Sequence, residues 1–94
     1  MTITRINDFY AANGREGALR EFLQSVISVI KGASGCMGVE LLVESENAAH
    51  LVIAEKWRDI SAHQAAANLI PPGKLAEVQA LLAAPPKGVY YEQV

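Results

Sequence analysis

The chain has 94 residues, 51% of them hydrophobic, and its eight Lys and Arg against ten Asp and Glu leave a net charge of −2. The basic residues are scattered and form no stripe that could neutralise phosphates, which argues against nucleic acid as a partner. No apolar run is long enough to span a bilayer, and the first residues lack the apolar core of a signal peptide. A single Cys allows no internal disulfide, so the cytoplasm is the expected location.

The length fits one domain over residues 1–94. A chain this short removes only about 60 to 65% of its extended surface from water, so its own core is small. The high apolar fraction therefore predicts that part of the surface is buried against a second copy, in a homodimer.

The first predicted elements are a strand and a helix. Residues 2–10 alternate as a strand does. Asn13 and Glu16 have the spacing of a capping box, which predicts a helix beginning near Gly14. It should end at Gly32, since Gly can adopt the left-handed cap conformation. Its core-facing stripe comprises Leu19, Phe22, Leu23, Val26 and Ile30.

A hairpin is predicted next, with strands at residues 37–44 and 50–57 and a turn at Ser45-Glu46-Asn47. Both alternating sets of side chains in these strands include apolar residues. A strand with one face in water does not have that pattern. The sheet is therefore expected to need cover on both faces.

Asp59 is well placed to cap a second helix over residues 60–69. Pro71-Pro72 must end this helix, because proline cannot donate a backbone hydrogen bond and restricts the residue before it. A third helical segment should follow.

This third segment is predicted to open at Gly73 and to end at Pro85-Pro86, before a final strand over residues 88–94. Four of its residues are expected to share one face: Leu75, Val78, Leu81 and Leu82. The whole order is strand, helix, strand, strand, split helix, strand. It predicts an α+β, ferredoxin-like antiparallel sheet with the helices on one face. Two such sheets packed face to face would form a dimeric α+β barrel.

His63 is the first candidate for chemistry. It stands four residues after Asp59, one turn into its helix and near the end of the preceding strand. An imidazole titrates near neutrality and can take a proton from a phenol or hydroquinone. The alternative is a half-buried helix histidine that hydrogen-bonds locally. His50, beside a turn, is interpreted as a surface residue.

Glu55 and Trp57 share one strand face with apolar neighbours. A carboxylate in such surroundings must find a partner or raise its pKa. Arg5 or Asn7 on the first strand could reach Glu55, which would make it a structural ion pair. Trp57 offers a flat wall for a planar ligand, or it fills the core.

Asn7 is unusual in the middle of a strand, since its amide needs partners when buried. It could orient a substrate oxygen, or bond Glu55 or a neighbouring backbone. Tyr10, Tyr90 and Tyr91 place phenols near strand ends, where one could line a pocket while the others pack, and Tyr10 is expected to contact the substrate. Cys36 has no basic neighbour in sequence and is interpreted as a buried structural thiol. The His, Cys and Gly residues lack metal-site or phosphate-loop spacing, so no metal and no tightly bound cofactor is expected.

The run from Gly35-Cys36 through the hairpin to Glu55-x-Trp57 and His63 resembles the antibiotic biosynthesis monooxygenase domain. The resemblance covers nearly the whole chain. It implies a dimeric ferredoxin-like barrel that oxidises a small phenolic, quinol or polyketide-like aromatic substrate with O₂, without metal or flavin. In such chemistry the protein deprotonates the substrate in a dry pocket, and the anion itself reduces O₂.

This resemblance implies a role for four of the candidate residues. His63 would act as the base, with Asn7 and Trp57 positioning the aromatic ring. Glu55 would support the base or relay a proton.

Two other classes share the fold. Haem-degrading relatives use an Asn in the first strand with a Trp and a His on later helices. Here the helical Trp position falls within Ala65-Ala66-Ala67 and no His follows His63, which argues against haem. The other class is a non-oxidative small-molecule binding or signal-processing protein, because fold does not determine function. The absence of a second helical His favours this alternative.

Overall fold

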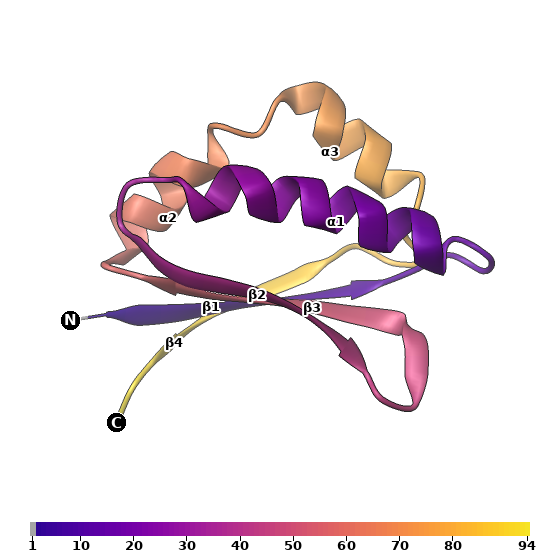
Figure 1. Cartoon of the computed structure of the whole chain (residues 1–94), viewed down its shortest axis with the longest axis horizontal. Helices are drawn as coiled ribbons and strands as arrows, with labels where there is room; N and C mark the ends of the chain where they lie inside the picture. The colour runs from indigo at the N-terminus through magenta and orange to yellow at the C-terminus, as the bar shows by residue number, and fades with distance from the viewer. Residues whose placement is uncertain (1) are drawn as a thin grey trace.

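The computed structural model describes residues 2–94, which form a four-stranded antiparallel sheet with three helices on one face (Figure 1). The elements, in chain order, are β1 (Ile3–Tyr10), α1 (Glu16–Lys31), β2 (Cys36–Glu44), β3 (Asn47–Trp57), α2 (Ile60–Ala67), α3 (Pro72–Gln79) and β4 (Lys87–Glu92). The strands lie in the order β2-β3-β1-β4. The predicted ferredoxin-like α+β fold is confirmed.

Helix α1 covers the sheet with the predicted stripe, of which Leu19, Phe22, Leu23 and Ile30 are buried. The predicted capping box is wrong. The helix begins at Glu16 after Arg15, and no side chain caps it. Gly14 turns the chain with φ +80, which separates Asn13 from the helix start. Glu16 Oε1 still accepts a hydrogen bond from a preceding backbone N–H, at 3.4 Å, but that N–H belongs to Gly14.

The hairpin is tighter than expected. Strand β3 already begins at Asn47, so Ser45 and Glu46 alone separate the two strands. The Asn47 side chain accepts a hydrogen bond from Ala49 N–H at 3.0 Å, which supports the turn. Strand β2 begins at Cys36, and its register against β3 shifts between Cys36 and Gly38.

The second and third helices differ from their predicted bounds. The Asp59 cap of α2 is confirmed, since its Oδ1 accepts from Ala62 N–H at 2.8 Å. Helix α2 ends at Ala67, two residues earlier than expected. Helix α3 starts at Pro72 rather than Gly73, because a proline fits the first helical position, where its N–H is not needed.

Helix α3 ends at Gln79, well before the second proline pair. The chain then turns, and Leu82 forms an isolated bridge with Ala11 after β1. Of the four residues expected to share a buried face, Val78 is buried and Leu75 is 56% exposed. The expected face is therefore only partly formed.

The core lies between the helices and the sheet. One cluster under α1 and α3 comprises Ala11, Leu19, Phe22, Leu23, Leu51, Ile53 and Val78. A second, around the end of β3 and α2, comprises Ile3, Ile30, Trp57, Ala62 and Ala66. No element of residues 2–94 covers the other side of the sheet (Figure 1). No helix in the described part of the chain is long and apolar enough to cross a membrane.

Candidate functional site

A cavity of about 300 Å³ lies between the sheet and the helices. Apolar side chains from all three helices and the sheet form most of its lining. Its polar lining side chains are Arg5, Asn7, Glu55 and His63, with Trp57 beside them. Such a cavity, mostly apolar with a few convergent polar groups, is typical of small-ligand sites, and its volume is at the lower end of their range.

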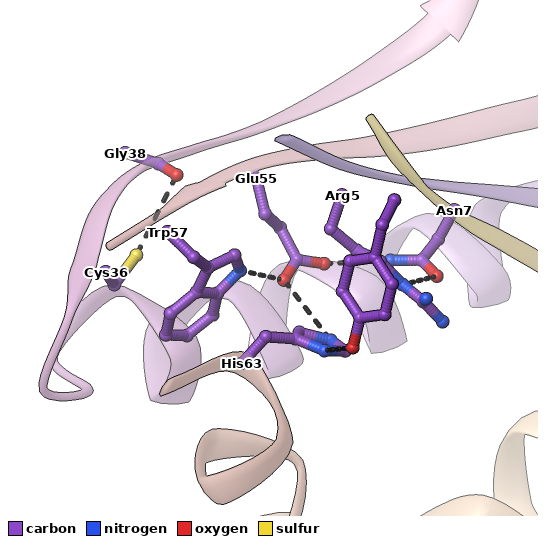
Figure 2. Close-up of polar contacts among 8 residues, drawn as sticks. Arg5, Asn7, Cys36, Gly38, Glu55, Trp57 and His63 are labelled. Atoms are coloured by element: carbon purple, nitrogen blue, oxygen red, sulfur yellow. Dashed lines mark hydrogen bonds and ion pairs between the residues drawn. The ribbon is translucent and has the colours of Figure 1, made fainter. Parts of the chain in front are cut away.

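The strand register brings the polar side chains together. Arg5 in β1 lies opposite Glu55 in β3 on one side and opposite Tyr90 in β4 on the other. Two positions along, Asn7 lies opposite Gly88. Residues directly opposite one another on neighbouring strands project from the same face, so this row of side chains points toward the helices (Figure 2).

Glu55 is 3% exposed and accepts two hydrogen bonds. Trp57 Nε1–H donates to Oε1 at 2.8 Å, and Asn7 Nδ2–H donates to Oε2 at 2.8 Å (Figure 2). Burial raises the pKa of Glu55, and the bond from Trp57, the charge of Arg5 and the bond from Asn7 oppose that rise. Of the two partners expected for Glu55, Asn7 is the one that bonds it directly, and Arg5 forms no ion pair with it. The hydrogen bond from Trp57 to Glu55 was not expected from the sequence.

His63 reaches the same row from the first turn of α2. Its Nδ1 lies 2.5 Å from the Tyr90 hydroxyl, and its Nε2 lies 3.9 Å from Glu55 Oε1, beyond hydrogen-bond distance. Its ring meets Trp57 edge-on, at 5.6 Å between centroids. Burial lowers the pKa of His63, and the charge of Arg5 lowers it further. Both effects favour the neutral form of the imidazole.

The close approach of α2 to the sheet depends on Gly35. This residue has φ +87, and its carbonyl accepts from Arg58 N–H at 2.8 Å, which ties the start of β2 to the end of β3. A Cβ at Gly35 would lie 2.6 Å from the Ala62 Cβ. The Gly-Cys pair noted in the sequence thus makes room for the helix that carries His63.

Four of the five candidate residues meet at this site: Asn7, Glu55, Trp57 and His63. Tyr10 lies on the opposite face of the sheet, where its ring stacks on His50 at 4.4 Å. It stands three positions from Asn7, so strand alternation alone places the two on opposite faces.

His50, interpreted as a surface residue, is half-buried on that same face. It bonds Glu44 Oε1 through Nδ1 at 2.7 Å and Asp8 Oδ1 through Nε2 at 2.8 Å. These carboxylates raise its pKa. Within residues 2–94 no group of three or more His, Cys, Asp or Glu is arranged to hold a metal ion.

Sequence reasoning missed Gly88 as part of the site, and among the three tyrosines near strand ends it chose Tyr10 rather than Tyr90. Gly88 and Tyr90 both follow Pro86 on β4, in the alternating Gly-Val-Tyr-Tyr run. Alternation separates Tyr90 from Tyr91, but only pairing with β1 shows that Tyr90 faces the helices while Tyr91 is 50% exposed.

Fold and site together define a class: small α+β proteins that enclose an apolar cavity with a histidine and a carboxylate at its wall. The chain matches the family described as antibiotic biosynthesis monooxygenase over residues 2–69, and it belongs to that family. No curated protein matches it.

Solved structures agree on the fold. Rv0793 from Mycobacterium tuberculosis is 22% identical, with a TM-score of 0.87 over 100% of this chain and 96% of that one. PA3566 from Pseudomonas aeruginosa is 23% identical, with a TM-score of 0.85 over 99% and 94%. A variant of SnoaB, a cofactor-independent oxygenase from Streptomyces nogalater, is 17% identical, with a TM-score of 0.82 over 98% and 92%. At these identities the likeness concerns the fold.

Proposed function

We propose that this protein is a cofactor-independent monooxygenase that oxidises a small phenolic, quinol or polyketide-like aromatic substrate with O₂. One observation carries the proposal. A neutral imidazole, His63, stands at the wall of an apolar cavity between a tyrosine hydroxyl and a buried carboxylate. Membership of the family supports it. The fold that the chain shares with SnoaB, itself a cofactor-independent oxygenase, also supports it.

The base would be Nε2 of His63. When Nδ1–H donates to the Tyr90 hydroxyl, the lone pair on Nε2 is free to take a proton from a substrate hydroxyl or an acidic CH. The imidazolium that forms lies 3.9 Å from Glu55 Oε1, and the negative charge of an ionised Glu55 would stabilise it. Tyr90 and Glu55 thus position and support the base, while His63 performs the proton transfer.

The electrons would come from the substrate. For an anthrone-type CH₂ group the balance is CH₂ + O₂ → C=O + H₂O. The substrate anion gives one electron to O₂, and the carbon radical and superoxide combine to a peroxide anion. This anion takes the proton back from the His63 imidazolium to form a ring hydroperoxide, and loss of water from the hydroperoxide leaves the carbonyl. Both C–H bonds are consumed, so no external reductant is needed. A dry apolar cavity favours this sequence because it keeps bulk water from the anion.

Asn7 and Trp57 would hold the ring. Trp57 is fully buried and lines the cavity, and its indole N–H is engaged by Glu55, so its orientation is fixed. Asn7 lines the cavity as well, with its amide held between Arg5 and Glu55.

The assembly we propose is a homodimer, located in the cytoplasm. The uncovered face of the sheet carries apolar side chains, among them Ile6, Val52, Val89 and the 46% exposed Leu42. A second copy packed on this face would remove them from water, as in a dimeric α+β barrel.

Oxygen uptake tests the function. The purified protein is incubated with anthrone and with 1,4-naphthohydroquinone, and O₂ consumption is followed against buffer and heat-denatured protein. We expect uptake above the spontaneous rate, with one O₂ consumed per anthrone and no hydrogen peroxide released. Absence of uptake across the panel would contradict the proposal. Binding of these phenols without turnover would instead favour the non-oxidative binding protein.

A further inference from the structure

Arg5 is a cation at the cavity wall that forms no ion pair within the described chain, although its charge acts on the nearby Glu55. It is half-buried and lines the cavity, yet among residues 2–94 the structure shows no ion pair to its guanidinium. Glu55 lies opposite Arg5 in register, but its two oxygens are occupied by Trp57 and Asn7. A charge in mostly apolar surroundings is costly unless an opposite charge or water meets it.

The guanidinium is held in one orientation by its neighbours. Nε–H donates to Asn7 Oδ1 at 3.2 Å, and Cζ lies 4.5 Å from the centroid of the Tyr90 ring. A cation over an aromatic face is attracted by the ring. Arg5 is thus positioned by the hydrogen bond of Nε and by the contact of its guanidinium with the Tyr90 ring, and within residues 2–94 its Nη atoms take part in no hydrogen bond (Figure 2).

The Nη atoms are also accessible. Every fully buried side-chain nitrogen and oxygen in the described chain has a hydrogen-bond partner. The Nη atoms of Arg5 form no hydrogen bond there, so they are open to the cavity and its solvent. Four N–H donors in a planar fork match the two oxygens of a carboxylate.

Gly88 makes room for this arrangement. A Cβ at this position would overlap Cζ and one Nη of Arg5, and Oδ1 of Asn7. Gly88 itself lines the cavity. The missing side chain on β4 therefore lets the guanidinium lie close to the strand.

No other Lys or Arg lines the cavity in the described chain, and burial and the charge of Arg5 favour the neutral form of His63. Glu55 is the acidic lining residue, with each oxygen already accepting a hydrogen bond. The guanidinium of Arg5 is thus the charged group at the cavity wall that still has unused hydrogen-bonding capacity, in the N–H donors of its two Nη atoms.

We propose that the cavity binds small planar aromatic ligands that carry a carboxylate, and that the Nη edge of Arg5 receives this carboxylate. The inference rests on the proposed function for the reaction and makes phenols with an acid group the preferred members of its substrate class, which neutral phenols can also enter. His63 and Arg5 both contact Tyr90, so one small aromatic ligand can reach both. The acid end would be held at Arg5 while the reacting end lies at His63.

Calorimetric titration with a matched pair of ligands tests the proposal. The ligands are 2-naphthoate and its neutral counterpart 2-naphthamide, titrated under argon at pH 7.5 so that no turnover contributes. We expect naphthoate to bind about 10-fold or more tightly than naphthamide, the size expected of hydrogen bonds to a charged group. Arg5→Gln should abolish this preference and leave naphthamide binding unchanged.

Two further variants separate charge from geometry. Gly88→Ala keeps every charge but displaces the guanidinium, so it should also reduce the preference for naphthoate. Lys87→Gln removes one positive charge from an exposed residue of the same strand and should leave the preference intact.

Equal affinity for the two ligands in the wild-type protein, or no binding of either, would overturn the proposal. An equal loss of both affinities in Arg5→Gln would make Arg5 a structural residue. The two proposals, the oxygenase reaction and the binding of a carboxylate at Arg5, can fail independently. A naphthoate preference that depends on Arg5, without O₂ uptake from any phenol, contradicts the reaction and not the binding. Uptake with neutral phenols and no naphthoate preference contradicts only the binding.

Discussion

Glu55 and His63 are two titrating groups whose pKa values move toward each other in the folded protein. Burial raises the pKa of Glu55 above 4.5 and lowers that of His63 below 6.5. Both shifts favour the uncharged form, because the site is poorly solvated. A neutral histidine can accept a proton, and a carboxyl group nearby can respond to the charge that then appears.

The role of His63 as base predicts a large loss of turnover on its removal. His63→Ala should lower kcat by about 10²-fold or more, the usual contribution of a general base. The melting temperature should change little, since the helix retains its Asp59 cap. His50→Gln alters the only other histidine, on the opposite face, and should keep full activity. Full activity of His63→Ala would remove it from the mechanism.

The same assignment predicts the pH profile of kcat/KM. A base acts in its deprotonated form, so activity should rise with pH through the pKa of His63. Because burial and Arg5 lower this pKa, the midpoint should lie below 6.5. Rates of O₂ uptake from pH 5 to pH 8 measure it. A midpoint above 6.5 would contradict a buried, neutral base.

Glu55 is predicted to contribute mainly to stability. Glu55→Ala leaves the N–H groups of Trp57 and Asn7 without acceptors, which should cost about 1 to 3 kcal/mol of unfolding free energy. Urea unfolding measures it, with Glu21→Ala on the exposed side of α1 as control. A well-folded but inactive Glu55→Ala protein would show instead that Glu55 takes part in the chemistry.

Glu55 should also give stability a defined pH dependence. Its folded pKa lies above the unfolded value of about 4.5, so the folded state holds the proton more tightly. The stabilisation that the tightly held proton of Glu55 gives the folded state is complete below pH 4.5. It is lost as the pH rises through the folded pKa. The fall in unfolding free energy that Glu55 causes above pH 4.5 should be absent in Glu55→Ala, so the slope against pH should be more positive in the variant. An unchanged slope would contradict the raised pKa.

His50 should make the stability of the protein depend on pH in a second, separate pH range. Its pKa is raised by Glu44 and Asp8, so its contribution to stability is present below 6.5 and lost as pH rises through the folded pKa. His50→Gln should remove this loss of unfolding free energy, while the pH dependence that Glu55 causes should remain. Identical unfolding curves for the two proteins between pH 6 and pH 8.5 would show that the two carboxylates do not hold the imidazolium.

At the scale of elements, the docking of α2 decides where His63 lies. Gly35→Ala should destabilise the protein by two effects, a strained backbone at φ +87 and the overlap with Ala62. Gly14→Ala is the matched control, because Gly14 has φ +80 with no atom within 4 Å of a new Cβ. The control should cost about 1 to 2 kcal/mol from backbone strain alone.

The Gly35 variant should cost about 1 to 3 kcal/mol more than that control, the range for overpacking. It should also lower kcat, since a displaced α2 moves His63 away from Tyr90 and Glu55. Urea unfolding and O₂ uptake measure the two effects. Equal losses of stability in the two variants would mean that Ala62 simply moves aside.

At the scale of the whole molecule, the uncovered sheet face predicts the oligomeric state. Light scattering should give twice the chain mass of 10.1 kDa at micromolar concentration. Ile6→Lys places a charge in the middle of this face, opposite Ala54 and Val89, and should yield a monomer. Leu69→Lys changes an apolar residue that is 57% exposed on the helical side and should stay dimeric. A stable wild-type monomer would contradict the proposal.

Much of this protein could be predicted from local sequence patterns. The alternation in β3 places Glu55 and Trp57 on one face, and Asp59 begins the helix that carries His63. These features depend on neighbours a few positions apart, so the sequence displays them directly. The same alternation already separated Tyr10 from Asn7. The helix bounds were less certain, because a turn at Gly14 overrode the apparent capping box.

Only the tertiary structure decided which side chains meet. Arg5, Glu55 and Tyr90 form one row because β1 lies between β3 and β4 in a particular register, and a one-residue slip would reverse every face. Nothing near Tyr90 or Gly88 in the sequence shows that they lie against His63 and Arg5. The choice of Asn7 and Trp57 as partners of Glu55, with Arg5 left open, depends on side-chain geometry between segments far apart in the chain.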